Sequence, residues 1–160
     1  MAQRLYFLEP SLPERLFNRL FGIMIGLGLG LDHNYVLEVR GRKSGRVYSA
    51  PIDLLELNSR RYLVAPRGET NWVLNARAAG RVLLRKRGYR EQFSIREVAA
   101  EQRQALLKAY LDRFAPTVQR YFPVPSGSPA SAFAPIAQRY PVFELVPAAE
   151  APATSQSPTE

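Results

Sequence analysis

The sequence of 160 residues contains no cysteine and a single histidine, His33. Without cysteine the chain can form no disulfide and offers no thiolate as a nucleophile or metal ligand. One histidine also argues against a histidine-rich metal site and against a Ser-His-Asp triad centred elsewhere. We therefore expect no metal centre, and the lack of cysteine fits a cytoplasmic protein.

Long hydrophobic runs are missing as well. The uncharged stretch at residues 20–31 has 12 residues, whereas a helix needs about 20 to span a bilayer. Ser11 and Pro13 precede it and favour the start of a helix. Residues 1–33 are therefore predicted to form an N-terminal helix and apolar segment. It packs on the core or a partner subunit, or, as the alternative, makes a peripheral contact with a membrane.

Acidic residues are scarce where basic residues are concentrated. The formal net charge is +8, and residues 40–90 hold thirteen Lys or Arg against Asp53, Glu56 and Glu69. A field of this sign favours an anionic partner. The alternative is a surface that only keeps the protein soluble, so the placement of the charges matters.

Alternating hydrophobic residues predict short strands at 34–40, 46–57, 61–66, 81–87, 90–98 and 140–146. Helices are predicted at 71–79, ending before Gly80, and at 100–115, where Pro116 stops the helix. Pro51 places its strand at a sheet edge or a bulge. Five or six mostly antiparallel strands with inserted helices predict an α+β barrel as one domain, residues 34–146. Residues 147–160 are predicted to be a disordered tail.

The stretch VRGRKSGRVYSAP, residues 39–51, gives the charge a place. Arg42, Lys43 and Arg46 crowd one hairpin turn, and Ser44 adds a hydroxyl group. The glycines of the turn let the backbone curl and present N–H groups. Arginine holds phosphate or carboxylate in a bidentate manner, while lysine acts as a mobile point charge. The turn is therefore a candidate clamp for an anionic group, with a solvated hairpin tip as the alternative.

A second stretch, VAPRGETNWVLNARAAGRV at 64–82, places a Pro-Arg-Gly turn directly before a helix. The N–H groups at a helix start suit an anion or a polarised heterocycle. Trp72 and Asn75 share one helical face, and an indole beside an amide suits a flat polar ring. The alternative is that Trp72 anchors the core and Asn75 is its satisfied polar neighbour.

These two stretches, followed by QRYFPVP and YPVFEL, resemble the deazaflavin (F420)-dependent nitroreductase family over about residues 12–146, in order and spacing. The resemblance implies a split β-barrel that binds coenzyme F420, with the phosphate and glutamate tail on the hairpin and the ring at the APRG turn. The cofactor-binding residues that it implies are Arg42, Lys43, Ser44, Gly45, Arg46, Pro51, Ala65, Pro66, Arg67, Gly68, Trp72, Asn75 and Arg77.

The resemblance also implies an oxidoreductase that passes a hydride from the reduced deazaflavin to a nitroaromatic, a quinone or another electron-poor acceptor. Tyr121 and Phe122 are expected to line the acceptor site, and Tyr121 is the candidate proton donor. After APRG the chain reads ETNW, which is shorter than the corresponding loop of the better-known nitroreductases and leaves the native acceptor open.

Other occupants of the same barrel stay open, namely FMN, haem or a fatty acid. A basic nucleic-acid-binding barrel is less favoured because the strands have few exposed aromatic residues at stacking spacing. The resemblance implies a small-molecule electron acceptor as partner and, because the family often dimerises, a homodimer; no nucleic acid is expected.

Overall fold

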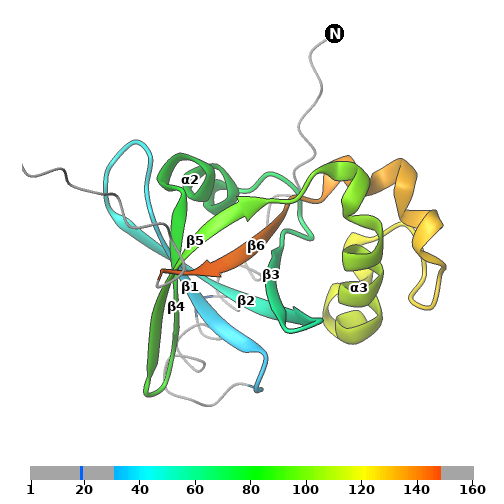
Figure 1. The fold of residues 1–160 in the computed structure, drawn as a ribbon, viewed down its shortest axis with the longest axis horizontal. Helices are drawn as coiled ribbons and strands as arrows, with labels where there is room; N and C mark the ends of the chain where they lie inside the picture. Colours follow the sequence, from blue (N-terminus) through cyan, green and yellow to red (C-terminus); the bar gives the residue numbers. More distant parts are fainter. Residues whose placement is uncertain (1–18, 20–30, 149–160) are drawn as a thin grey trace, which may run out of the picture.

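The computed structural model describes residue 19 and residues 31–148 (Figure 1). The predicted N-terminal helix falls outside the described residues, and so does the predicted disordered tail, residues 147–160, from residue 149 onward. The first residue of that predicted tail, Pro147, is instead the last residue of the strand β6 (Val142–Pro147).

Within the described residues, six strands form a closed barrel in the order β1-β2-β3-β6-β5-β4. The strands are β1 (Asn34–Arg40), β2 (Val47–Leu57), β3 (Arg60–Val64), β4 (Arg81–Lys86), β5 (Tyr89–Glu97) and β6 (Val142–Pro147). All neighbouring pairs are antiparallel. The predicted antiparallel barrel of the α+β class is confirmed.

Among the described residues, helices follow two of the strands, β3 and β5. They are α2 (Asn71–Ala79), α3 (Gln104–Val118) and the 3₁₀ helices η1 (Ala100–Gln102), η2 (Gln119–Tyr121) and η3 (Ala130–Arg139). α2 has the predicted bounds, and Gly80 caps it with a left-handed φ of 70°. No helix in the described part of the chain is long and apolar enough to cross a membrane.

The prediction that Pro116 ends the second helix is wrong. α3 bends at Phe114, with φ −115° and ψ 18°, and then continues through Pro116 to Val118. Proline lacks an N–H and crowds the carbonyl four residues earlier, so a bend lets the helix continue past it. The Thr117 hydroxyl donates to the Phe114 carbonyl, at the bend, at 3.0 Å.

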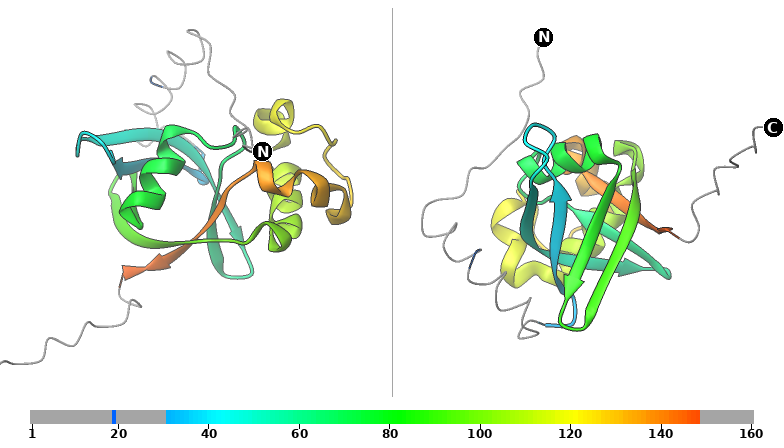
Figure 2. Two further views of the ribbon diagram at one scale, coloured as in Figure 1. Left: turned by 90° about the horizontal axis from the view of Figure 1, so that it is seen from above. Right: turned by 90° about the vertical axis from the view of Figure 1, so that its left-hand side faces the viewer.

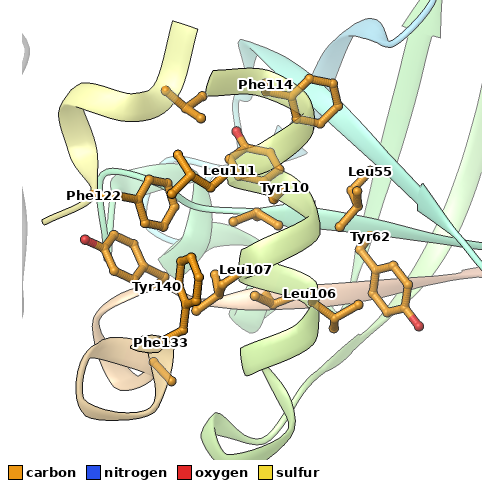
Figure 3. Close-up of a cluster of buried hydrophobic side chains, with 14 of the residues drawn as sticks. Leu55, Tyr62, Leu106, Leu107, Tyr110, Leu111, Phe114, Phe122, Phe133 and Tyr140 are labelled. Atoms are coloured by element: carbon orange, nitrogen blue, oxygen red, sulfur yellow. The ribbon is translucent and has the colours of Figure 1, made fainter. Parts of the chain in front are cut away.

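Strand alternation divides the hydrophobic core in two. Leu54 and Leu63 point into the barrel, while their chain neighbours Leu55 and Val64 point outward and pack against α3. The outer cluster joins the α3 stripe to the segment that follows it (Figure 3): Leu106, Leu107, Tyr110, Leu111, Phe114, Phe122, Phe133 and Tyr140. α3 is therefore fixed to the outside of β2, β3 and β6.

Pro51 lies where β2 has a partner on one side. Residues 47–53 pair with β1, whereas pairing with β3 begins at Leu54. The Leu54 N–H donates to His33 O at 2.8 Å, so by alternation the nitrogen of Pro51 points away from β1. The local edge position predicted for Pro51 is confirmed, and no ladder hydrogen bond is lost there.

Candidate functional site

The tip of the β1–β2 hairpin is a tightly bonded turn. Gly41 N donates to Arg46 O at 2.7 Å, and Gly45 N donates to Gly41 O at 3.0 Å. Gly45 has a φ of 71°, which an L-residue adopts only with strain. The Ser44 hydroxyl accepts from Arg46 N at 3.2 Å and lies 3.2 Å from the Tyr48 hydroxyl. Ser44 therefore helps to shape the turn.

The turn places its cations in solvent without carboxylate partners. Arg42, Lys43 and Arg46 are exposed, and within residues 31–148 none of them forms an ion pair. Elsewhere in the same basic segment several cations pair with carboxylates. For example, Arg60 pairs with Glu144 at 3.2 Å. The hairpin is thus one of the places where the positive charge seen in the sequence stays without a carboxylate partner within residues 31–148.

The hairpin is attached to α2 through a buried amide. Asn75 is 4% exposed, and its Oδ1 accepts from Arg42 N at 3.1 Å and from Arg42 Nη1 at 2.7 Å. Figures 1 and 2 show the hairpin loop beside α2, at the end of the molecule away from α3. The structure thus brings together two stretches that lie about thirty residues apart in the sequence, and Asn75 serves as the joint.

α2 is held by the interior of the barrel. Val73 and Ala76 are fully buried in the barrel cluster, and the half-buried Trp72 packs on it with its ring 6.0 Å from that of Phe143. Trp72 therefore anchors the core and the amide of Asn75 has its hydrogen bonds within the protein, as the alternative to ligand binding predicted. Only the exposed part of Trp72 remains for a ligand.

The turn between β3 and α2 contains a polar atom without a partner. Ala65 N donates to Pro141 O at 2.9 Å and Gly68 N to Ala65 O at 3.1 Å, so two of the three N–H groups in APRG are used within the protein. Thr70, the residue before α2, makes no capping hydrogen bond, and its Oγ1 is buried without a partner among the described residues. A buried hydroxyl of this kind normally finds a partner, so it suits a polar ligand atom.

Sequence reasoning missed Thr70, although the signal was present. The helix start at residue 71 was predicted, and threonine immediately before a helix is a typical N-cap residue. Five residues of helical rise, about 7.5 Å, separate Thr70 from Asn75, the residue that holds the hairpin. One helix therefore connects the cationic turn to the APRG turn.

Arg77 is committed to two carboxylates. Its Nε and Nη2 donate to Glu97 at 2.9 and 2.6 Å, and its Nη1 donates to Glu69 at 2.9 Å. These hydrogen bonds, first those to Glu97, raise the pKa of Arg77 above its usual value. Each of the three guanidinium nitrogens of Arg77 already donates to a carboxylate. In this arrangement Arg77 therefore does not make the cofactor contact that the resemblance implies.

Tyr121 and Phe122 lie on the α3 side of the barrel. Phe122 is 6% exposed and stacks on Tyr140, with ring centroids 4.5 Å apart. The half-buried Tyr121 accepts a hydrogen bond from Arg120 Nη2 at 2.7 Å. The structure does not bring these residues together with the hairpin, and Phe122 is part of the core in this arrangement.

The fold and this site together define a small barrel that presents a cationic turn and a helix start to a ligand. Residues 15–122, about two-thirds of the chain, match the family described as F420H(2)-dependent quinone reductase. The chain belongs to this family. It is an F420-dependent reductase, an oxidoreductase whose cofactor is coenzyme F420.

Solved structures with a TM-score of at least 0.50 share the fold. A domain-swapped dimer is 20% identical over 83% of this chain and 92% of its own, with a TM-score of 0.51. A protein of unknown function from Agrobacterium tumefaciens is 14% identical over 72% and 48%, with a TM-score of 0.50. An F420-H2-dependent reductase is 19% identical over 71% and 94%, with a TM-score of 0.49. The comparison with curated proteins gives no match.

The residues present fit the cofactor. Coenzyme F420 carries a phosphate and a glutamate tail, which match the unpaired cations of the hairpin. Its heterocyclic ring has polar atoms, which match the unpartnered Thr70 hydroxyl and the uncapped start of α2.

Proposed function

We propose that the protein reduces a quinone or a similar electron-poor acceptor, such as a nitroaromatic compound, with the cofactor tail on the β1–β2 hairpin and its ring at the β3–α2 turn. The observation that carries this proposal is the group of hairpin cations with no carboxylate partner within residues 31–148. Family membership supports the reaction type, and the geometry supports the placement.

The residues divide into two groups in this proposal. Lys43 and Arg46 bind the anionic tail, and Arg42 adds the two guanidinium nitrogens that do not bond to Asn75. The Thr70 hydroxyl and the exposed part of Trp72 orient the ring, and Pro51 lines the site from β2. Bound F420 supplies the hydride; the protein aligns ring and acceptor and keeps water out.

The experiment is a fluorescence titration of the purified protein with F420. Lys43→Glu with Arg46→Glu should weaken binding at least about tenfold, because two attractions become repulsions. Arg42 is left intact because it also holds the hairpin to Asn75. Arg87→Glu, in the exposed β4–β5 turn, is the matched control and should bind like the wild type. Equal binding by the double variant and the wild type would falsify the tail assignment.

The acceptor side is the second part of the proposal. We assign Tyr121 as the proton donor to the reduced acceptor, on the family resemblance alone. Tyr121→Phe should then lower kcat and leave F420 binding unchanged. Unchanged kcat would remove Tyr121 from the reaction.

A homodimer is also proposed. The domain-swapped dimer that shares this fold supports it, and β2 offers the open edge of residues 47–53 next to exposed Val47 and Tyr48. Sedimentation equilibrium that gives a monomer at all concentrations would contradict it.

A further inference from the structure

Four side chains of alternating charge connect the site to the far end of the barrel. In order they are Glu69 in the β3–α2 turn, Arg77 in α2, Glu97 at the end of β5, and Arg103 at the start of α3. Arg77 Nη1 lies 2.9 Å from Glu69 Oε1, and Arg77 Nη2 lies 2.6 Å from Glu97 Oε1. Arg103 Nη2 lies 3.3 Å from the same Glu97 oxygen.

The chain is anchored at Arg103. This residue is 7% exposed, and its Nε donates to Val98 O at 2.8 Å. Its Nη1 donates to Ala137 O and to Tyr140 O at 3.1 and 3.2 Å. A guanidinium group with this many fixed acceptors has one orientation. The position of the Glu97 carboxylate is therefore set by the packed part of the fold.

The other end of the chain is the turn that faces the proposed ring site. Glu69 stands between Gly68, whose φ is 83°, and Thr70, whose hydroxyl has no partner among the described residues. Two backbone hydrogen bonds shape the turn from within, from Gly68 N to Ala65 O and from Thr70 N to Gly68 O. Its two ends are tied outside the turn, because Ala65 N donates to Pro141 O at 2.9 Å and Leu74 N in α2 donates to Thr70 O at 3.2 Å. Glu69 lies between these tied ends. The Glu69–Arg77 ion pair supplies a link from its side chains to α2 and, through Glu97, to β5.

Arginine is the residue type that this link needs. Its planar group bonds Glu97 through Nε and Nη2 in a bidentate manner while Nη1 reaches Glu69 on the other side. A lysine has one nitrogen and cannot hold both carboxylates in fixed directions. The arrangement is thus specific to arginine in a way that a single surface ion pair is not.

We propose that Arg77 is a positioning residue: it acts through Glu69 to fix the β3–α2 turn, residues 65–70, against the reacting ring, and it does not touch the cofactor. The inference rests on the proposed function, because that function places the ring at this turn. Loss of Arg77 should therefore misplace the ring while the tail stays bound at the hairpin.

The first measurement needs no cofactor. Amide hydrogen exchange of Gly68 and Thr70 in the unliganded protein should become at least about tenfold faster in Glu69→Gln and in Arg77→Lys, because the turn opens more often. Arg81→Gln, at the exposed start of β4, is the matched control and should exchange like the wild type. Unchanged exchange in Glu69→Gln would overturn the inference whatever the cofactor does.

The second measurement separates positioning from binding. In single-turnover reduction of an acceptor quinone at saturating F420, Glu69→Gln and Arg77→Lys should each lower the hydride-transfer rate about tenfold, while Kd for F420 changes less than about threefold. The double variant should be no slower than the slower single variant, because both remove one link. A Kd raised tenfold with an unchanged saturated rate would instead make Arg77 a cofactor contact.

The two proposals fail differently. If the hairpin double variant binds F420 normally, the tail assignment is lost, while the exchange and rate results still decide the role of Arg77. If the wild type binds no F420, both are overturned. Glu69→Gln keeps the Arg77–Glu97 pair, so the test stands even if substitution of Arg77 prevents folding.

Discussion

At the scale of single residues, two glycines offer a matched pair. Gly45 in the cationic hairpin and Gly88 in the β4–β5 turn have φ values of 71° and 70°, and an added Cβ would meet no atom within 4 Å at either place. Alanine should therefore cost the same at both, about 1 kcal/mol of unfolding free energy. Only Gly45→Ala should also weaken F420 binding, because it strains the turn that carries Lys43 and Arg46.

The measurements are urea unfolding and an F420 titration of both variants. Equal losses of stability with a selective rise in Kd for Gly45→Ala support the hairpin as the tail site. A similar Kd for the two variants would mean that the shape of the hairpin is irrelevant to binding.

Asp53 gives a prediction about pH. Burial raises its pKa above 3.8, against the opposing effects of His33, Asn34 and Thr117. A carboxyl group with a raised folded-state pKa contributes stability that is present below 3.8 and is lost as pH rises through the folded value. Asp53→Asn removes this loss, so it should raise Tm relative to the wild type more at about pH 7 than at about pH 3.

The control is Asp32→Asn, which removes an exposed carboxylate from the neighbouring turn. Both variants and the wild type are compared by thermal unfolding in parallel at the two pH values. A pH-independent effect of Asp53→Asn would contradict the assigned direction.

The sequence predicted where single residues lie in the elements better than which partners their side chains bond. The sequence places Arg42 and Asn75 in the right turns and helix, because glycine and hydrophobic spacing act locally. Which partner a polar side chain takes depends on residues distant in the chain. Asn75 bonds Arg42 and Arg77 bonds Glu97, twenty or more residues away, and no spacing rule predicts such pairs.

At the scale of elements, Arg103 joins the barrel to the segment after α3. It is buried and bonds the carbonyls of Val98, Ala137 and Tyr140. Burial lowers its pKa, although Glu97 opposes this. Arg103→Met keeps the apolar stem and leaves those carbonyls without a donor, so it should reduce the free energy of unfolding by about 3 kcal/mol.

Urea unfolding checks this value, with Arg81→Met as the exposed control. The control should change the free energy of unfolding by less than about 0.5 kcal/mol. If Arg103→Met matches it, the η3 segment is held by its hydrophobic contacts alone.

Elements defined by local patterns were predicted well, and those defined by packing were not. α2 has the predicted bounds because Gly80 caps it locally. η3 was missed, since its Phe133 and Ile136 are buried only once α3 and Tyr140 are in place. The predicted end of α3 before Pro116 was wrong for the same reason. Val118 packs in the outer cluster, and this contact favours continuing α3 beyond the bend at Phe114.

At the scale of the whole molecule, the fold determines which of the basic side chains pair with carboxylates. Strands β1, β5 and β6 bring carboxylates to the basic segment: Glu38 holds Arg85 at 2.7 Å, Glu97 holds Arg77, and Glu144 holds Arg60. The hairpin cations Arg42, Lys43 and Arg46 have no carboxylate partner within residues 31–148. The sequence predicted the excess charge, but only the barrel order shows where it remains unpaired.

This distribution predicts how salt acts on the cofactor. Exposed charges are screened within about 10 Å at 0.1 M salt, so F420 held by Lys43 and Arg46 should bind about tenfold more weakly at about 500 mM than at about 50 mM sodium chloride. FMN, which carries a phosphate and no glutamate tail, should show a smaller slope of log Kd against log salt. Lys43→Gln with Arg46→Gln should flatten the F420 slope, and Arg87→Gln should leave it unchanged. If the slope is the same in all three proteins, the long-range field of the net charge of +8, and not the hairpin, attracts the cofactor.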